Sequence, residues 1–321
     1  MPSAPRDLPA WTLAADALRA GQPAALLCVV RSEGSSPGRQ GFKMAVTLGA
    51  VAGSIGGGVM EHKWVELTRE RLRAGDYAPL LRPQIHRREA PTNRSGMMCA
   101  GEQEVLLWPL SPADLPAVAA IEAVVRALGA GAGWEASEAA GLRLLPEAPA
   151  TFYEYQPGAA WHYRERLGFR DELVIVGGGH VSLALSRMAS ALEFEITVLD
   201  DRGPDLPTLA ANEVAHHIRQ VEYAALTIAP GLHRYVVVMT VGYRTDAVVL
   251  RRLLGHNYRY LGVMGSAAKV AELRRVLTEE GFDVSTLHGP IGVPISSRTP
   301  EEIAVSVAAE LIKVRNELPS R

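Results

Sequence analysis

The stretch 173–201 constrains this chain more than any other, because a strand, a glycine-rich turn, a helix and an acidic pair follow one another there. Residues 173–176 form a short apolar run, which is the pattern of a buried parallel strand. The run leads into Gly-Gly-Gly-His-Val-Ser, where Gly177 permits a tight turn and Gly179 permits close approach of the backbone to a phosphate. The acidic residues follow at the spacing that places a carboxylate beside a ribose. This order predicts a Rossmann-type fold.

The C-terminal half continues as short β-branched runs that alternate with helical segments. Such alternation is typical of right-handed βαβ units that build one parallel sheet. We therefore expect residues 169–321 to form a Rossmann-like, doubly wound α/β domain and residues 1–168 to form a mixed α/β domain. The expected strands of the Rossmann-like domain are Leu173–Val176, Glu195–Leu199, Glu213–Ile218, Tyr235–Thr240 and Tyr258–Val263. The expected helices are Val181–Ala191, Val221–Leu226, Asp246–Leu254, Ser266–Glu279 and Thr299–Glu317.

The crevice at the glycine-rich turn is a candidate nucleotide site. Asp200, at the end of the second expected strand, is placed to meet ribose hydroxyls and to repel a 2′-phosphate, so NAD is expected to outcompete NADP. Arg202 argues the other way, because a guanidinium favours a phosphate. The bulky His180 is unusual in a dinucleotide site, and the alternative is a Rossmann scaffold whose crevice serves another ligand. The candidate cofactor-binding residues here are Gly177, Gly179, His180, Asp200, Asp201 and Arg202.

Two further candidate segments follow the fourth and fifth expected strands. Open α/β sheets bind ligands at the carboxyl ends of their strands, which is where both segments lie. The alternative is a purely structural role, since helix capping alone favours aspartate and serine at such positions. The candidate cofactor-binding residues of these segments are Gly242, Asp246, Gly265, Ser266 and Lys269.

The N-terminal half combines helices and strands less regularly. Residues 76–101 are rich in proline and arginine and are expected to be irregular. The expected helices are Trp11–Ala20, Gly58–Ala74 and Pro112–Leu128, and the expected strands are Ala24–Arg31, Lys43–Thr47, Val51–Ile55 and Glu104–Trp108.

Two loops of the N-terminal half have the composition of anion-binding loops. The first, 53–58, opens a helix, so its free N–H groups and the helix dipole suit an anion, although a structural tight turn explains it equally well. The second, 33–41, offers hydroxyls, glycines and a guanidinium, with a lysine just beyond, and its alternative is an ordinary hairpin loop. The candidate cofactor-binding residues of the two loops are Ser35, Ser36, Lys43, Gly56, Gly57, Gly58 and Glu61.

The two cysteines differ in their surroundings. Cys28 lies in an uninterrupted apolar run and is expected to be buried and inert, because desolvation raises the pKa of a thiol. Cys99 lies in a glycine-flanked loop five residues after Arg94, where a thiolate is favoured. Cys99 is therefore the candidate catalytic residue and the candidate soft ligand for a metal such as molybdenum, and the alternative is that it is a packing residue.

Composition excludes several classes of protein. Lys and Arg number 33 against 35 Asp and Glu, without a run of like charge, so a nucleic-acid partner is not expected. The first residues lack a signal-peptide core and no apolar stretch is long enough to span a membrane, so we expect neither export nor membrane insertion. Two cysteines in 321 residues do not make a disulfide framework, which favours a cytoplasmic location.

The chain resembles the XdhC/CoxI family of xanthine dehydrogenase accessory proteins. The resemblance covers nearly the whole chain except about residues 111–165, and it rests on many segments in the same order, which is more specific than any single motif. Those segments are Glu33–Pro37, Gly41–Met44, Gly56–Glu61, Met98–Gly101, Gly177–Val181, Val198–Arg202, Tyr260–Ser266, Pro290–Ile295 and Thr299–Ser306.

The resemblance implies a protein that is not itself a dehydrogenase. It implies binding of the molybdenum cofactor (molybdopterin), support of its sulfuration by a cysteine desulfurase, and its delivery to a xanthine dehydrogenase-type apoenzyme. The family's functional cysteine matches Cys99, while the glycine-rich loops of one or both domains are expected to cradle the pterin phosphate. Two departures are Ala100, where the family commonly has glycine, and Tyr243, where it commonly has histidine.

Two other functions stay open on the sequence. The first is an NAD(P)-dependent oxidoreductase that uses the Rossmann crevice, with His180 or Tyr243 as the proton-transfer group. The second is a binding module that senses a nucleotide. Whether the chain forms a homodimer is also left open.

Overall fold

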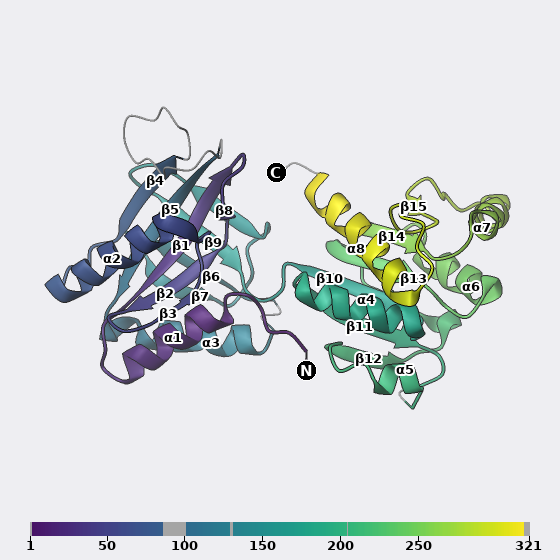
Figure 1. Cartoon of the computed structure of the whole chain (residues 1–321), viewed down its shortest axis with the longest axis horizontal. Helices are drawn as coiled ribbons and strands as arrows, with labels where there is room; N and C mark the ends of the chain where they lie inside the picture. The colour runs from purple at the N-terminus through teal and green to yellow at the C-terminus, as the bar shows by residue number, and fades with distance from the viewer. Residues whose placement is uncertain (1, 86–100, 129–130, 204, 318–321) are drawn as a thin grey trace. The chain divides into compact units, whose positions relative to one another are not determined.

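The chain divides into two compact units in a computed structural model (Figure 1). The N-terminal unit is Ala4–Gly168, and the Rossmann unit is Phe169–Arg321 together with Met1–Ser3. The structure describes residues 2–85, 101–128, 131–203 and 205–317. Ser3 joins the Rossmann unit because its carbonyl oxygen lies 2.9 Å from Nε2 of His216. Each unit has its own hydrophobic cores and is described by itself.

The N-terminal unit is built on a five-stranded antiparallel sheet with the strand order β3-β2-β1-β5-β4. Its strands are β1 (Ala24–Glu33), β2 (Lys43–Thr47), β3 (Val51–Gly53), β4 (Leu80–Ile85) and β5 (Glu102–Leu110). The helices of the unit are α1 (Leu8–Arg19), α2 (Gly58–Ala74) and α3 (Leu115–Arg126), and the single turn η1 (Pro112–Asp114) precedes α3.

The central strand β1 is apolar over Ala24–Val30 because both of its faces are covered there. Leu27 and its neighbours on one face pack with Trp64 of α2. Cys28 and its neighbours on the other face pack with Trp11 of α1 and Ile121 of α3. Successive side chains of a strand point to opposite faces, so a strand between two layers needs an unbroken apolar run.

A second, four-stranded antiparallel sheet completes the N-terminal unit, with the order β7-β6-β9-β8. Trp134 of this sheet packs edge-on against Trp11, with ring centroids 5.2 Å apart, and against Tyr163 at 5.4 Å. The contact with Trp11 of α1 joins the second sheet to the core that contains Cys28 of β1. The strands are β6 (Gly133–Ser137), β7 (Gly141–Leu145), β8 (Tyr153–Gln156) and β9 (His162–Arg166).

The Rossmann unit contains a six-stranded sheet in which every pair of neighbours is parallel. Its strand order, β12-β11-β10-β13-β14-β15, is the 3-2-1-4-5-6 order of dinucleotide-binding folds. The strands are β10 (Asp171–Val176), β11 (Phe194–Asp200), β12 (His217–Gln220), β13 (Gly231–Val238), β14 (Tyr258–Val263) and β15 (Leu287–His288). The helices are α4 (His180–Ala191), α5 (Pro207–Ala210), α6 (Tyr243–Leu253), α7 (Ala267–Glu279) and α8 (Pro300–Glu317), with the turn η2 (Tyr223–Ala225).

Helices cover both faces of this sheet. Leu173 and Ile175 of β10 belong to the core that contains α4 and α8, which lie side by side in Figure 1. Val174 and Val176 belong to the core that contains α6 and α7. The doubly wound α/β architecture predicted from the sequence is therefore confirmed for this unit, and the N-terminal unit has the predicted mixed α/β character.

Three local predictions are wrong. Residues 80–85, expected to be irregular, form β4, whose Pro83 is tolerated because β4 is an edge strand and an edge strand can lack one N–H donor. The helix expected over 221–226 is only the turn η2. The strand expected over 213–218 is β12 at 217–220, because His216 is held just before it by hydrogen bonds with both backbone groups of Ile196.

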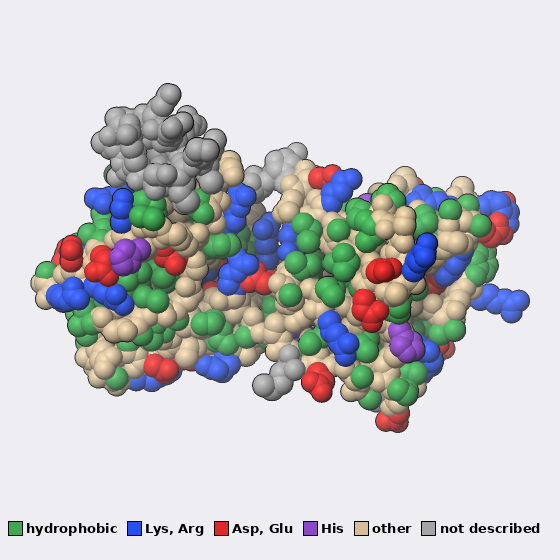
Figure 2. Space-filling model, viewed as in Figure 1, with side chains coloured by type: hydrophobic (Ala, Val, Ile, Leu, Met, Phe, Trp, Pro, Cys, Tyr) green, Lys and Arg blue, Asp and Glu red, His purple; other side chains and the backbone are tan. Residues whose placement is uncertain are grey.

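Charged side chains of both signs are interspersed over the visible face of each unit in Figure 2. Within the described ranges, no helix is both long and apolar enough to cross a membrane.

Candidate functional site

The candidate crevice of the Rossmann unit lies at the carboxyl ends of β10, β13 and β14, where three helices begin. Gly179 is the N-cap of α4, Gly242 is the N-cap of α6 and Ser266 is the N-cap of α7. Unpaired N–H groups and the helix dipole make such ends favourable for an anionic ligand. The structure thus brings the three glycine- and serine-bearing segments predicted from the sequence to one edge of the sheet.

The glycine-rich turn is tightly packed at its start and open at its end. Gly177 has a φ of 114°, and a Cβ atom there would lie 2.3 Å from the carbonyl oxygen of Met239. A Cβ atom at Gly179 would meet nothing within 4 Å, and His180, the first residue of α4, is exposed. A side chain would therefore fit at Gly179, at the N-terminus of α4, and not at Gly177.

Asp200 lies at the end of β11, where the sequence placed it, but its carboxylate is fully engaged inside the protein. The Gly178 amide donates to Oδ2 at 2.5 Å, and the Arg202 amide donates to Oδ1 at 2.8 Å. The Arg202 guanidinium donates to both oxygens, at 2.9 and 2.8 Å. Burial raises the pKa of Asp200, but the hydrogen bonds from Arg202 and Gly178 outweigh it and hold the pKa below its usual value. Asp201 is exposed beside it.

Asp246 and Lys269 form an ion pair at the crevice edge, between the first turns of α6 and α7. The Asp246 side chain is inaccessible to solvent and its Oδ1 accepts hydrogen bonds from the amide and the hydroxyl of Thr240, at 3.1 and 2.6 Å. Lys269 also donates to the Met264 carbonyl at 3.0 Å, and its side chain stays 23% exposed. Gly265 leaves room for this lysine, because a Cβ atom there would lie 2.6 Å from its Cδ. The pair therefore places a partly exposed lysine side chain at the edge of the crevice.

In the N-terminal unit, three segments far apart in sequence interlock at one place. The Gly38 amide donates to Oε1 of Gln103 at 3.0 Å, and Nε2 of Gln103 donates to the Ile55 carbonyl at 3.3 Å. A Cβ atom at Gly101 would lie 2.4 Å from the backbone of Ser35 and Ser36. We call residues 35–38, 55–58 and 101–103 the loop cluster. It joins both predicted loops to the start of β5.

Glu61 supplies the anion that the glycine-rich loop of the N-terminal unit binds. Its Oε2 accepts hydrogen bonds from the Ser54 hydroxyl at 2.6 Å and from the amides of Ile55 and Gly57, each at 2.9 Å. Glu61 was expected to contact a cofactor, yet its carboxylate caps its own loop. An external phosphate would have to displace the Glu61 carboxylate from these two amides. Space itself is not the obstacle, because a Cβ atom at Gly57 or Gly58 would meet nothing within 4 Å.

Lys43 is enclosed in the core, which does not fit the phosphate-binding role expected for it. Its side chain is 1% exposed, and its ammonium donates to Oε1 of Glu165 at 2.6 Å and lies 3.5 Å from Asp7. Burial alone would lower the pKa of Lys43, but Glu165 and Asp7 raise it above its usual value. Burial raises the pKa of Glu165 to about 7 against the opposing effect of Lys43. Lys43 is thus a core residue.

The two cysteines are placed differently. Cys28 is completely buried, as predicted, and burial raises the pKa of its thiol to about 12. Cys99 lies outside the described residues, as does Arg94. Gly101 follows Cys99 by two residues in the sequence and belongs to the loop cluster.

Several residues of these sites were missed in the sequence. Gln103 stands between two glutamates in the sequence. Side chains alternate between the two faces of a strand, so Gln103 shares a face with the apolar Val105 and Leu107, and this pattern could have predicted its burial. Thr208 and Leu209, which cover the glycine-rich turn of the Rossmann unit, carry no local signal. Glu165 carries none either, because its partner Lys43 is 122 residues away.

Among the described residues, no group of three or more His, Cys, Asp or Glu side chains is arranged to hold a metal ion.

Two relatives of known sequence align with about half of this chain. "Uncharacterized protein YqeB" of Escherichia coli K12 is 34% identical over 161 residues, which are 47% of this chain and 29% of that protein. A protein of Bacillus subtilis 168 that is named as a probable xanthine dehydrogenase subunit is 29% identical over 155 residues, which are 47% of this chain and 45% of that protein. The aligned region thus spans less than half the length of each relative.

A solved structure described as a xanthine dehydrogenase (BH1974) from Bacillus halodurans has the same fold. It matches with a TM-score of 0.68 over 97% of both chains, at 22% sequence identity. The XdhC and CoxI family matches residues 17–82, and the XdhC Rossmann domain matches residues 173–311. The two matches cover the greater part of the chain and fall in both units, so the chain belongs to the XdhC and CoxI family.

Proposed function

We propose that this chain is an accessory factor that binds the molybdenum cofactor and supports the maturation of a xanthine dehydrogenase-type enzyme. Family membership supports this proposal, together with the Bacillus subtilis relative that is named as a probable xanthine dehydrogenase subunit. The partners proposed with it are the apoenzyme that receives the cofactor and a cysteine desulfurase that supplies sulfur. The chain acts in this proposal as a carrier without a reaction of its own.

The observation that carries the proposal is the loop cluster. It fixes Gly101 against Ser35 and Ser36, and Gly101 follows Cys99 by two residues in the sequence. A thiolate is a soft ligand that suits molybdenum and sulfur, so Cys99 is the residue proposed to hold the metal. When bound, the cofactor would supply its own redox chemistry, and the chain would bind and protect it.

Within the Rossmann unit, the N-terminus of α4 is proposed as a site for an anionic group such as a phosphate. Gly179 leaves open space there, and the ion pair of Lys269 with Asp246 lies at the same edge of the sheet. The corresponding loop of the N-terminal unit is the weaker candidate, because Glu61 already occupies its amides. The Rossmann unit therefore fits an anionic group better than the loop cluster does.

The test compares Cys99→Ala with Cys28→Ala, each purified without oxygen from cells that make the cofactor. Molybdenum and pterin per protein chain are measured by metal analysis and by fluorescence of the released pterin. We expect Cys99→Ala to lose at least about tenfold in retained molybdenum while its unfolding midpoint stays unchanged. Cys28→Ala should keep the cofactor and lose about 1 kcal/mol of stability, because its effect is confined to core packing.

Wild-type cofactor content in Cys99→Ala would remove Cys99 from the site. A wild-type protein that carries a dinucleotide and no pterin would instead support the oxidoreductase or nucleotide-sensing alternatives.

A further inference from the structure

The space beside the end of β11, which a Rossmann fold normally offers to a ribose, is filled in this chain by its own side chains. A carboxylate has about four lone-pair positions for hydrogen bonds. Asp200 receives four donors from two residues, namely the Gly178 amide, the Arg202 amide and two nitrogens of the Arg202 guanidinium. Its side chain is also inaccessible to solvent. A ribose diol would find no free acceptor on this carboxylate.

Residues of α5 close the same region from the other side. Thr208 donates a hydrogen bond from its hydroxyl to the Gly178 carbonyl. The Leu209 side chain lies so close to Gly178 that a Cβ atom there would be 2.4 Å from Cδ2 of the leucine. The middle of the glycine-rich turn is therefore covered, while Gly179 at its end stays open.

Arg202 is the outermost member of this arrangement. Its side chain is 38% exposed, whereas Asp200 beneath it is inaccessible. A bidentate guanidinium–carboxylate pair fixes both groups in one plane, which makes Arg202 a stable cover rather than a mobile one.

We infer that Arg202 is a specificity-determining residue that closes the crevice to adenosine nucleotides and leaves it to a compact phosphorylated ligand. The ligand class rests on the proposed function, whereas the closure rests on the contacts of Asp200. The inference reverses the preference for NAD that Asp200 alone predicts from the sequence. It also separates this crevice from that of a dehydrogenase with the same strand order.

The experiment is a calorimetric titration of the full chain with NAD, NADP and AMP. Wild type is compared with Arg202→Met, which keeps the apolar part of the side chain and removes the guanidinium. The control is Arg187→Ala, which changes an exposed arginine of α4. We expect no binding to wild type or to Arg187→Ala at millimolar nucleotide. Arg202→Met frees two acceptor positions on Asp200, so NAD and AMP should bind it at least about tenfold more tightly than wild type.

Submillimolar binding of NAD or NADP to wild type would overturn the inference, and so would a failure of Arg202→Met to gain affinity while its unfolding midpoint matches wild type. Pterin content is measured on the same samples. Failure of the proposed function would appear as a protein that carries no pterin. Failure of this inference would appear as nucleotide binding to wild type or as no gain of affinity in Arg202→Met, so the two failures are distinguishable.

Discussion

The N-terminal unit and the Rossmann unit each contain a lysine paired with a buried carboxylate, and the two pairs differ in their access to water. Lys43 and Glu165 are 1% and 5% exposed, and Tyr163 and Trp134 donate further hydrogen bonds to the carboxylate. Lys269 is 23% exposed, although its partner Asp246 is inaccessible. A pair sealed in the core can act only on stability, whereas a pair whose lysine side chain is partly exposed can also meet a ligand.

The difference follows from position in each fold. Lys43 lies on β2, between the main sheet and the second sheet, which covers it with Trp134. Lys269 lies in the first turn of α7, at the carboxyl edge of a parallel sheet, where no further layer is needed to cover it. In the sequence, both residues are lysines near glycines. The two differ only in the folded structure, where a second sheet covers Lys43 and no further layer of described residues covers Lys269.

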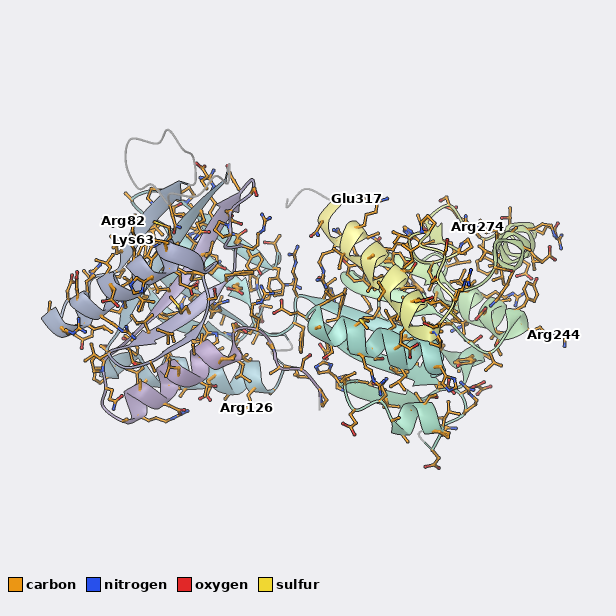
Figure 3. All side chains as sticks on the ribbon, viewed as in Figure 1. Lys63, Arg82, Arg126, Arg244, Arg274 and Glu317 are labelled. Atoms are coloured by element: carbon orange, nitrogen blue, oxygen red, sulfur yellow. The ribbon has the colours of Figure 1, made fainter. Side chains whose placement is uncertain are left out.

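The largest effect is expected for Lys43→Met. Removal of the ammonium leaves Glu165 and Asp7 together without their cation, and breaking one side of a buried pair costs about 3–5 kcal/mol. All five tryptophans of the chain lie within residues 4–168, so tryptophan fluorescence during urea denaturation reports on the N-terminal unit. The matched control is Lys63→Met on α2, an exposed lysine (Figure 3), which should change stability by less than about 0.5 kcal/mol. Equal effects of both variants would show that the Lys43 pair does not stabilise the unit.

The second largest effect concerns pH. Because burial raises the pKa of Glu165 to about 7, the folded state binds a proton between about pH 4.5 and 7 that the unfolded state has released. Stability of the N-terminal unit should therefore fall as the pH rises from 5 to 7, by about 2 kcal/mol. Urea denaturation at several pH values checks this slope.

Glu165→Gln should flatten that slope, while the exposed Glu70→Gln on α2 should keep it. An unchanged slope in Glu165→Gln would assign the pH dependence to other groups.

The Rossmann unit could be predicted from the sequence because its local patterns agree with its fold. The apolar run before Gly177 is a strand buried on both faces, and the glycine there is required by a φ of 114°. The second sheet of the N-terminal unit was not predicted, because charged residues interrupt its apolar pattern. Glu135 of β6 is buried and pairs with Arg143 and Arg164 of the neighbouring strands, at 2.6 and 2.7 Å. Such pairs form only once the strands have met.

The candidate site was predictable in its backbone and not in its side-chain contacts. Glycines and helix starts at the carboxyl edge are local features, and they lie where the sequence placed them. The engagement of Asp200 by Arg202, and of the glycine-rich loop by Glu61, depends on which side chains fold back onto the backbone. Composition cannot distinguish a carboxylate that awaits a ligand from one that is already bound within the chain.

A smaller effect is expected for Lys269→Met. It leaves Asp246 without its cation, but Thr240 still donates two hydrogen bonds to the carboxylate and solvent reaches the edge of the crevice. We expect a loss of about 1.5–3 kcal/mol, the contribution of a hydrogen bond to a charged group. Circular dichroism follows the whole chain, and the tryptophan signal should stay at its wild-type midpoint. The exposed Lys313→Met on α8 is the control. A loss as large as that of Lys43→Met would show that the two pairs are equivalent.

The smallest effect is expected for Glu61→Gln, which sharpens the contrast between an enclosed and an accessible carboxylate. Glutamine retains an oxygen that can accept from Ile55 and Gly57 but removes the negative charge at the N-terminus of α2. Helix-end charges contribute about 0.3–1 kcal/mol, and salt screens them when they are accessible to solvent. The tryptophan unfolding midpoint should therefore fall slightly at low salt, and the difference from wild type should shrink at about 1 M NaCl, where the screening length is about 3 Å.

Lys43→Met should keep its full effect at the same salt concentration, because its partners are buried. A salt-independent loss in Glu61→Gln would mean that Glu61 acts through hydrogen-bond geometry alone, and that its charge contributes nothing to holding the loop.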